Sequence, residues 1–224
     1  MKIENNILKH YLRNVYFITG TAYAGKSTAV RLLAERHGGI CCGENYTEAL
    51  HHLVEPAVWP CLGYFETMSG WREFVTRSPE EYAAWIEGCS EETAEFELAI
   101  LLQKAAEGRP VFVDTNLSLE ILREIAAPRQ VAVMLAPPKM SVDRFFERED
   151  AEKQMLYREL MACPDPEAAM ENYRQCLMRI NSEEACRRFE ESGFFVWHRR
   201  EDSRIEEALT ALERHFGLGA FAGE

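Results

Sequence analysis

This chain has few basic residues for its acidic content, and it has no long apolar run. Its 224 residues include 25 Lys and Arg against 37 Asp and Glu, so the net charge is -12. A surface of this sign repels polyanions unless its basic residues cluster, and we expect no nucleic-acid partner. No apolar stretch reaches the length of a membrane span, and residues 1–6 lack a signal peptide's continuous apolar region. We therefore expect a cytoplasmic protein with no membrane partner.

The seven cysteines form no C-x-x-C pair and have no spacing typical of a zinc site. An odd, scattered set favours reduced thiols over disulfides. Cys41 and Cys42, with His51 and His52 nearby, could in principle ligate a metal. Adjacent strand residues point to opposite faces, however, so buried or half-buried thiols are the preferred interpretation.

The chain does contain a complete phosphate-loop motif. Residues 20–27 read Gly-Thr-Ala-Tyr-Ala-Gly-Lys-Ser, which matches G-x-x-x-x-G-K-S/T, and an apolar run at 15–18 precedes them. Glycines without a Cβ let successive N–H groups point inward, and the following helix adds partial positive charge. Lys26 would reach the β- and γ-phosphates, and the Ser27 hydroxyl would contact Mg²⁺. The expected nucleotide-binding residues are Gly20, Thr21, Ala22, Tyr23, Ala24, Gly25, Lys26, Ser27 and Thr28.

The alternative interpretation of this segment is a Gly-containing turn that binds nothing. It is disfavoured because the motif lies where its context requires, between an apolar strand and a helical pattern.

Strand and helix patterns alternate along the rest of the chain. The strand-like runs are 15–19, 39–42, 110–114, 130–135 and 194–198. The helical patterns are 27–37, 91–107, 119–126, 141–160, 166–191 and 203–216. This alternation predicts an α/β fold with a mostly parallel sheet covered on both faces, and an active site at the carboxyl ends of the strands.

We expect one domain over residues 1–224, with an irregular insertion at 46–90. The insertion holds three prolines and many aromatic residues without a strand signal, which suggests helices and loops that cap the sheet edge. An acceptor pocket could form there. The alternative, at least as probable for any single aromatic residue, is that these side chains only form the core of small helices.

Two carboxylates follow strand-like runs. Asp114 ends an apolar strand, where phosphate-loop proteins commonly place an Asp near Mg²⁺, although Asp is also a common turn former. Glu44 follows the second strand, where it could orient an acceptor hydroxyl and take its proton. Its alternative role is that of a residue at a helix N-terminus.

Arg144 and Arg148 lie four residues apart in a helical pattern that follows the strand at 130–135. This spacing puts both guanidinium groups on one face, where they could stabilise charge on a migrating phosphoryl group. The equally weighted alternative is a solvated helix face with ordinary ion pairs.

In their order, these features resemble the P-loop small-molecule kinases, which include nucleoside-monophosphate, shikimate and gluconate kinases and antibiotic phosphotransferases. The resemblance covers nearly the whole chain in architecture, but only residues 20–28 match in detail. It implies a three-layer α/β/α P-loop NTPase fold with a five-stranded sheet in the order 2-3-1-4-5, which matches the five strand candidates, and a helical cap. Residues 138–160 are a possible lid.

By that resemblance, Lys26 is the phosphate lysine, Ser27 the magnesium hydroxyl and Asp114 a magnesium-associated or base carboxylate. Arg144 and Arg148 would be lid arginines. The chain departs from the family in having no D-G-x-P-R signature, which disfavours a nucleoside-monophosphate acceptor, and the role of Glu44 transfers only by position.

The sequence thus predicts a kinase that uses ATP and Mg²⁺ to phosphorylate a small molecule. ATP is the default donor because the N-K-x-D guanine signature is absent. The alternative is a P-loop ATPase or nucleotide-dependent switch whose aromatic region binds a protein. A third possibility is a nucleotide-binding protein without turnover. The arginine-bearing segment favours the kinase.

Overall fold

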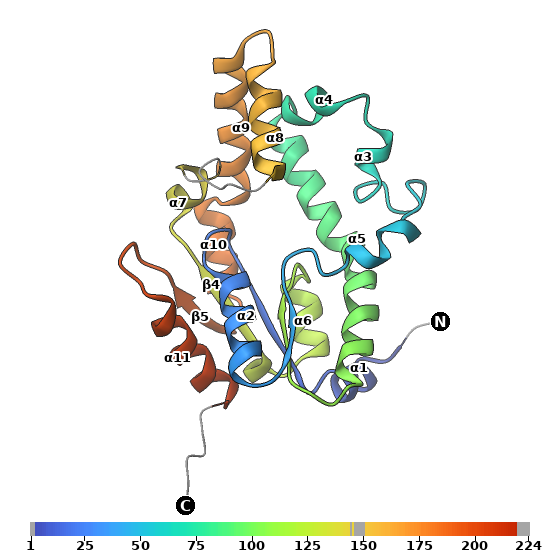
Figure 1. The fold of residues 1–224 in the computed structure, drawn as a ribbon, viewed down its shortest axis with the longest axis vertical. Coiled ribbons are helices and arrows are strands. Elements are labelled where there is room, and N and C mark those ends of the chain that lie inside the picture. The colour runs from blue at the N-terminus through green and yellow to red at the C-terminus, as the bar shows by residue number, and fades with distance from the viewer. Residues whose placement is uncertain (1–2, 144, 146–150, 219–224) are drawn as a thin grey trace, which may run out of the picture.

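The computed structural model describes residues 3–143, 145 and 151–218. At its centre is a five-stranded sheet in the order β2-β3-β1-β4-β5, and all neighbouring strands are parallel (Figure 1). The strands are β1 (Val15–Gly20), β2 (Ile40–Cys42), β3 (Val111–Asp114), β4 (Val131–Leu135) and β5 (Phe195–His198). The expected α/β class, the five strands and the strand order are confirmed.

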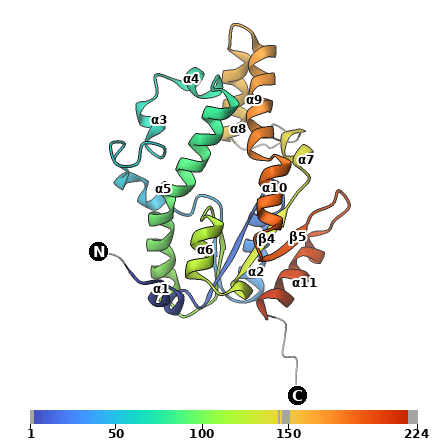
Figure 2. The same ribbon diagram turned by 180° about the vertical axis from the view of Figure 1, so that it is seen from behind.

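Helices cover both faces of this sheet, and the inner strands are therefore mostly apolar, with polar residues only at their carboxyl ends. Every residue of β3 and β4 is buried. Phe17 and Ile18 are adjacent in β1 and point into opposite cores. One face is covered by α1 (Asn5–Tyr11), α5 (Pro79–Ala105) and α6 (Leu119–Ile125), the other by α2 (Lys26–Arg36) and α11 (Ile205–Phe216) (Figures 1 and 2).

A third core lies away from the sheet, among the helices drawn at the top of Figure 1. Its elements are α3 (Tyr64–Thr67), α4 (Trp71–Val75), α7 (Pro138–Asp143), α8 (Ala151–Met161), α9 (Pro166–Ile180) and the N-terminal part of α5. Phe74 and Tyr82 from the aromatic stretch pack there with Leu160 and Tyr173. The described parts of the cap and lid segments thus pack against one another.

Two helices differ from the sequence-based expectation. The helix expected over 91–107 begins at Pro79 instead, because Ser78 and Glu81 form a capping box. The Ser78 hydroxyl accepts from the Glu81 N–H at 3.2 Å, and the Glu81 carboxylate accepts from the Ser78 N–H at 2.9 Å. Residues 79–90, which were expected to belong to the insertion, therefore form the first part of α5.

The single helix expected over 166–191 is two helices, α9 and α10 (Glu183–Glu190). The Ser182 hydroxyl accepts from the Ala185 N–H at 3.2 Å, and the Asn181 amide donates back to the Leu177 carbonyl at 2.9 Å. These local hydrogen bonds end one helix and start the next. Two short elements, α1 and the 3₁₀ turn η2 (Pro128–Gln130), were not expected, whereas the 3₁₀ turn η1 (Glu48–Leu53) lies in the insertion where helices and loops were expected.

The cysteines and the described helices show neither a disulfide nor a candidate metal site or membrane span. All seven cysteines are free thiols. Among the residues that the structure describes, no three His, Cys, Asp or Glu side chains gather closely enough to hold a metal ion. In the same residues, no helix combines the length and apolar character that a bilayer crossing requires.

The close approach of β1 to β4 predicts that position 20 tolerates only glycine. A Cβ at this position would lie 2.0 Å from the Met134 carbonyl oxygen, and the backbone φ is +127°. At Gly25, φ is +94° but the nearest atom to a Cβ is 3.9 Å away. We expect Gly25→Ala to cost about 1 kcal/mol through backbone strain alone, and Gly20→Ala to cost clearly more. Urea denaturation of both variants measures this, and equal stabilities would contradict the close approach.

Candidate functional site

The phosphate-loop segment connects the carboxyl end of the central strand β1 to the N-terminus of α2. Its backbone takes positive φ at Gly20 (127°), Tyr23 (63°) and Gly25 (94°). Such a value is uncommon for a residue with a Cβ and tends to occur at functional sites. The segment thus forms an irregular bend between β1 and α2.

Neighbouring strand ends hold this bend in place. The Thr21 N–H donates to the Met134 carbonyl at 3.1 Å, and the buried Thr21 hydroxyl accepts from the Ala136 N–H at 2.8 Å. From the other side, the guanidinium of Arg199, just beyond β5, donates to the Tyr23 carbonyl. The loop is fixed by β4 and β5 at both of these points.

The centre of the bend presents consecutive unpaired backbone donors. Within residues 3–143, 145 and 151–218, the N–H groups of residues 24–28 have no hydrogen-bond acceptor. Residues 26–28 form the first turn of α2, where the helix dipole adds partial positive charge. This arrangement fits a polyanion, because its oxygens would satisfy several of these donors at once.

The side chains of three predicted site residues, Lys26, Ser27 and Asp114, lie close together. Lys26 donates to the Thr21 carbonyl at 3.1 Å and lies 3.9 Å from an Asp114 oxygen. The Ser27 hydroxyl donates to the other Asp114 oxygen at 2.7 Å. Burial raises the pKa of Asp114, while the Lys26 charge and the Ser27 hydrogen bond oppose that rise. The predicted juxtaposition of loop lysine, loop serine and strand-end carboxylate is therefore present.

Glu44 is exposed beyond the end of β2. It is close enough to Asp114 for its negative charge to raise the pKa of that carboxyl further. The backbone turns sharply next to it, since Asn45 has φ of 63°. Glu44 is thus at the same edge of the sheet as Asp114.

Arg144 and Arg148, the proposed lid arginines, lie outside the described residues. The aromatic residues of the 46–90 stretch are described, and most of them pack on one another. Arg77 stacks 3.7 Å from the centre of the Tyr64 ring, with Phe74 and Trp85 also around it. These side chains form a structural core, which was the alternative interpretation of their density.

A buried carboxylate that sequence reasoning missed supports the strand end. Glu97 of α5 is 1% exposed and accepts hydrogen bonds from three groups. These are the Tyr46 hydroxyl at 2.9 Å, the Thr115 hydroxyl at 2.5 Å and the Asn116 N–H at 3.0 Å. Burial raises the pKa of Glu97, and these three bonds counteract the rise. Glu97 thus links the turn that follows Asp114 to the segment that follows Glu44.

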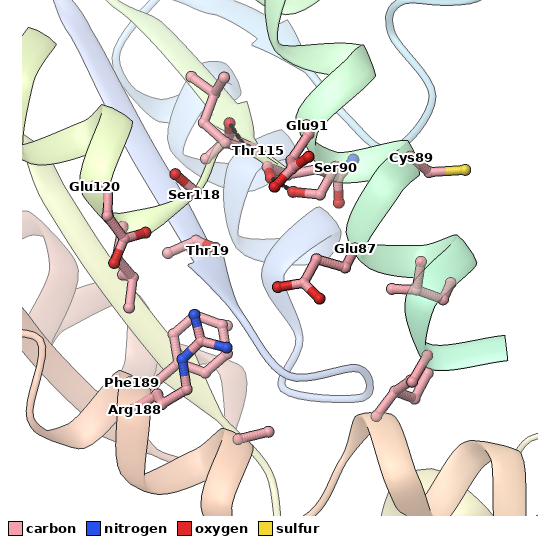
Figure 3. A pocket seen from close by; sticks show the side chains of 18 of the residues that line it. Thr19, Glu87, Cys89, Ser90, Glu91, Thr115, Ser118, Glu120, Arg188 and Phe189 are labelled. Atoms are coloured by element: carbon pink, nitrogen blue, oxygen red, sulfur yellow. Dashed lines mark hydrogen bonds between the residues drawn. The ribbon is translucent and has the colours of Figure 1, made fainter. Parts of the chain in front are cut away.

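An open pocket of about 960 Å³ adjoins this edge of the sheet (Figure 3). Thr19 and Gly20 at the end of β1 line it, as do the residues that follow β3. Its walls come from α5, α6, the end of α9 and α10. Neither Glu44 nor any aromatic residue between 59 and 85 is among its lining residues in the described chain. The α5 wall comes from the N-terminal half of that helix and lies partly within the 46–90 insertion, but the aromatic side chains of the insertion do not line the pocket in the described chain.

Further polar residues at the site were absent from the sequence-based predictions. Arg199 directly follows the β5 strand, and a cation just beyond a strand end in an α/β protein could have signalled its contact with the loop. Arg179 and Arg188 line the pocket but lie on helical patterns rich in charge. Nothing in their spacing distinguishes them from solvated surface residues.

Comparison with protein-family models, with curated proteins and with solved structures finds no match for this chain. The interpretation of the site therefore rests on its own residues and geometry.

The Glu97 contacts predict a large effect on stability. Glu97→Ala leaves two hydroxyls and one N–H without their acceptor, and we expect a loss of about 3 kcal/mol in the free energy of unfolding. Glu97→Gln keeps an acceptor oxygen and should lose less. Urea denaturation measures both, with Glu95→Ala, an exposed position on the same helix, as the control. A Glu97→Ala variant as stable as this control would contradict the network.

Proposed function

We propose that this protein is a phosphotransferase that uses ATP and Mg²⁺ to phosphorylate a hydroxyl group of a small molecule. The observation that carries the proposal is the run of unpaired N–H groups at residues 24–28. Two residues of this run, Lys26 and Ser27, also have their side chains next to Asp114. A triphosphate needs many fixed donors in place of water, and this segment offers them at a helix N-terminus.

The residues present also fit a magnesium ion held together with the nucleotide. Mg²⁺ in such sites takes few protein ligands and completes its shell with phosphate oxygens and water. The Ser27 oxygen has lone pairs free to bind the metal while its O–H donates to Asp114. When bound, the metal would offset charge on the β- and γ-phosphates. Lys26 would turn from the Thr21 carbonyl toward the same phosphates.

In the proposed reaction, the acceptor oxygen forms a bond to the γ-phosphorus. The bond from that phosphorus to the β,γ-bridging oxygen breaks, and ADP leaves with the electron pair. The hydroxyl proton passes to a carboxylate, for which Glu44 is our candidate because Asp114 is already engaged by Ser27 and Lys26. Because Glu44 does not line the pocket, this role requires the acceptor hydroxyl to extend from the pocket past the end of β3. Arg144 and Arg148 would stabilise charge on the migrating group.

The pocket beside the loop favours a kinase over a nucleotide-dependent switch. A kinase needs a pocket next to the γ-phosphate for its acceptor, whereas a switch needs loops that respond to that phosphate. The pocket reaches Gly20 at the start of the loop, and about 960 Å³ is enough for a small metabolite.

The first prediction from this function concerns the loop lysine. Lys26→Ala removes the side-chain cation proposed to contact the phosphates, so we expect Mg-ATP affinity to fall by about a hundredfold, the size expected when charge-assisted hydrogen bonds to both the β- and γ-phosphates are lost. Isothermal titration measures the affinity, and Lys104→Ala, at a partly exposed lysine of α5, is the control. Unchanged affinity in Lys26→Ala would defeat the nucleotide assignment.

The second prediction concerns Asp114 and pH. Only the ionised carboxylate can assist a metal, and burial raises the pKa of Asp114 above its ordinary value of 3.8. Wild-type affinity for Mg-ATP should therefore exceed that of Asp114→Asn at neutral pH. This advantage should shrink as the pH falls through the raised pKa, because the wild-type carboxyl is then neutral like the amide. Titrations of both proteins across pH test this, and a ratio that stays constant would exclude Asp114 from the metal site.

A further inference from the structure

The pocket beside the phosphate loop has walls of opposite charge. Its ionisable lining residues are Glu87 and Glu91 of α5, Glu120 of α6, Glu184 and Arg188 of α10, and Arg179 of α9. Figure 3 shows Glu87 extending from α5 and Arg188 from α10 into the space beside Thr19. The α5 wall is thus acidic, and the wall that α9 and α10 contribute carries the arginines.

The carboxylates of the α5 wall have no structural task in the described part of the chain. Glu81 caps the start of α5, Glu92 accepts from the N–H groups of Cys61 and Leu62, and Glu97 holds the strand end. Glu87 and Glu91, in contrast, are exposed and make no hydrogen bond or ion pair to any described residue.

These two carboxylates also repel each other. They are four residues apart on one helix and so lie on the same face, an arrangement of like charges that is unfavourable. A hydroxyl of a neutral ligand would donate a hydrogen bond to one of these carboxylates but would leave their repulsion in place. An ammonium group would donate to both carboxylates and neutralise their charge.

The arginine wall suits a different part of the complex. Arg179 and Arg188 are exposed and form no ion pair within 4.0 Å among the described residues, although the charge of Arg188 helps to lower the pKa of Glu120. Planar guanidinium groups match phosphate oxygens well. Because Thr19 and Gly20 line the same pocket, these arginines face the side from which a γ-phosphoryl group would be transferred.

We propose that the acceptor of this enzyme is a small molecule that carries an ammonium group in addition to its hydroxyl, with the ammonium bound between Glu87 and Glu91. This inference depends on the proposed phosphotransferase function and names the acceptor class for the same site. Arg179 and Arg188 contact the phosphoryl group on the opposite side. An anionic acceptor, such as a nucleoside monophosphate, is repelled by the α5 wall.

A charge-sorted metabolite extract tests the acceptor class. Small molecules extracted from cells are separated at pH 7 into cationic, neutral and anionic fractions, and each is incubated with the protein and ATP labelled in its γ-phosphate. Labelled products are then identified by mass spectrometry. We expect the cationic fraction to yield a labelled, amine-containing product. Labelling confined to the neutral or anionic fraction, or absent from all three, would overturn the proposal.

Variants of the acidic wall connect that result to the pocket. With the cationic fraction or the amine identified in it, Glu87→Gln and Glu91→Gln should each raise KM by about tenfold, the size expected for one charge-assisted hydrogen bond. Glu95→Gln, an exposed glutamate of α5 outside the pocket, is the matched control. A KM for both pocket variants equal to that of the control would contradict the assigned ammonium site.

Mg-ATP titration of the same samples distinguishes a wrong acceptor class from a wrong phosphotransferase function. Protein that binds Mg-ATP but phosphorylates only neutral or anionic compounds retains the proposed function and loses the proposed acceptor. Protein that fails to bind Mg-ATP loses both.

Discussion

The backbone between β1 and α2 is held open by its neighbours, and the rest of the site depends on this constraint. Gly20 is pressed against the Met134 carbonyl, and Thr21 is bonded to the end of β4 on both its N–H and its hydroxyl. Among the described residues, the N–H groups of residues 24–28 have no hydrogen-bond acceptor. Because α2 starts inside the bend, the same geometry brings Lys26 and Ser27 to the carboxylate at the end of β3.

Helix α5 connects this edge of the sheet to the other parts of the molecule. Along its 27 residues, successive turns contribute to different structures. Tyr82 packs in the third core, Glu87 and Glu91 line the pocket, Glu97 bonds the turn after β3, and Leu101 packs under the sheet. A rigid helix of this length fixes the pocket wall relative to both the aromatic core and the strand ends. Any movement of the upper helices would then be transmitted to the acidic wall.

Much of the fold could be predicted from the sequence because buried parallel strands have short, apolar sequences. All five strands were found in this way, and the motif at residues 20–27 located the loop. Helix limits were less predictable, since Ser78 and Ser182 act as caps inside patterns that read as continuous or irregular. These caps depend on side-chain geometry rather than on periodicity.

In the candidate site, too, some residues could be predicted from local sequence and others could not. Lys26, Ser27 and Asp114 were identifiable because a motif and a strand end specify them locally. Glu97 was not, because a glutamate in a helical pattern reads as a solvated residue, and only the packing of α5 beside β3 buries it. The pocket-lining residues of α9 and α10 reach the pocket only through the packing of these helices, which no local pattern encodes.

The central claim is that the amides of residues 24–28 receive the oxygens of a polyphosphate. Amide hydrogen exchange, measured with and without Mg-ATP, tests it most directly, because these N–H groups have no acceptor among the described residues. The account predicts that Mg-ATP slows exchange most strongly in the segment that spans residues 20–28. Unchanged exchange in this segment at saturating Mg-ATP, or protection confined to other parts of the chain, would contradict it.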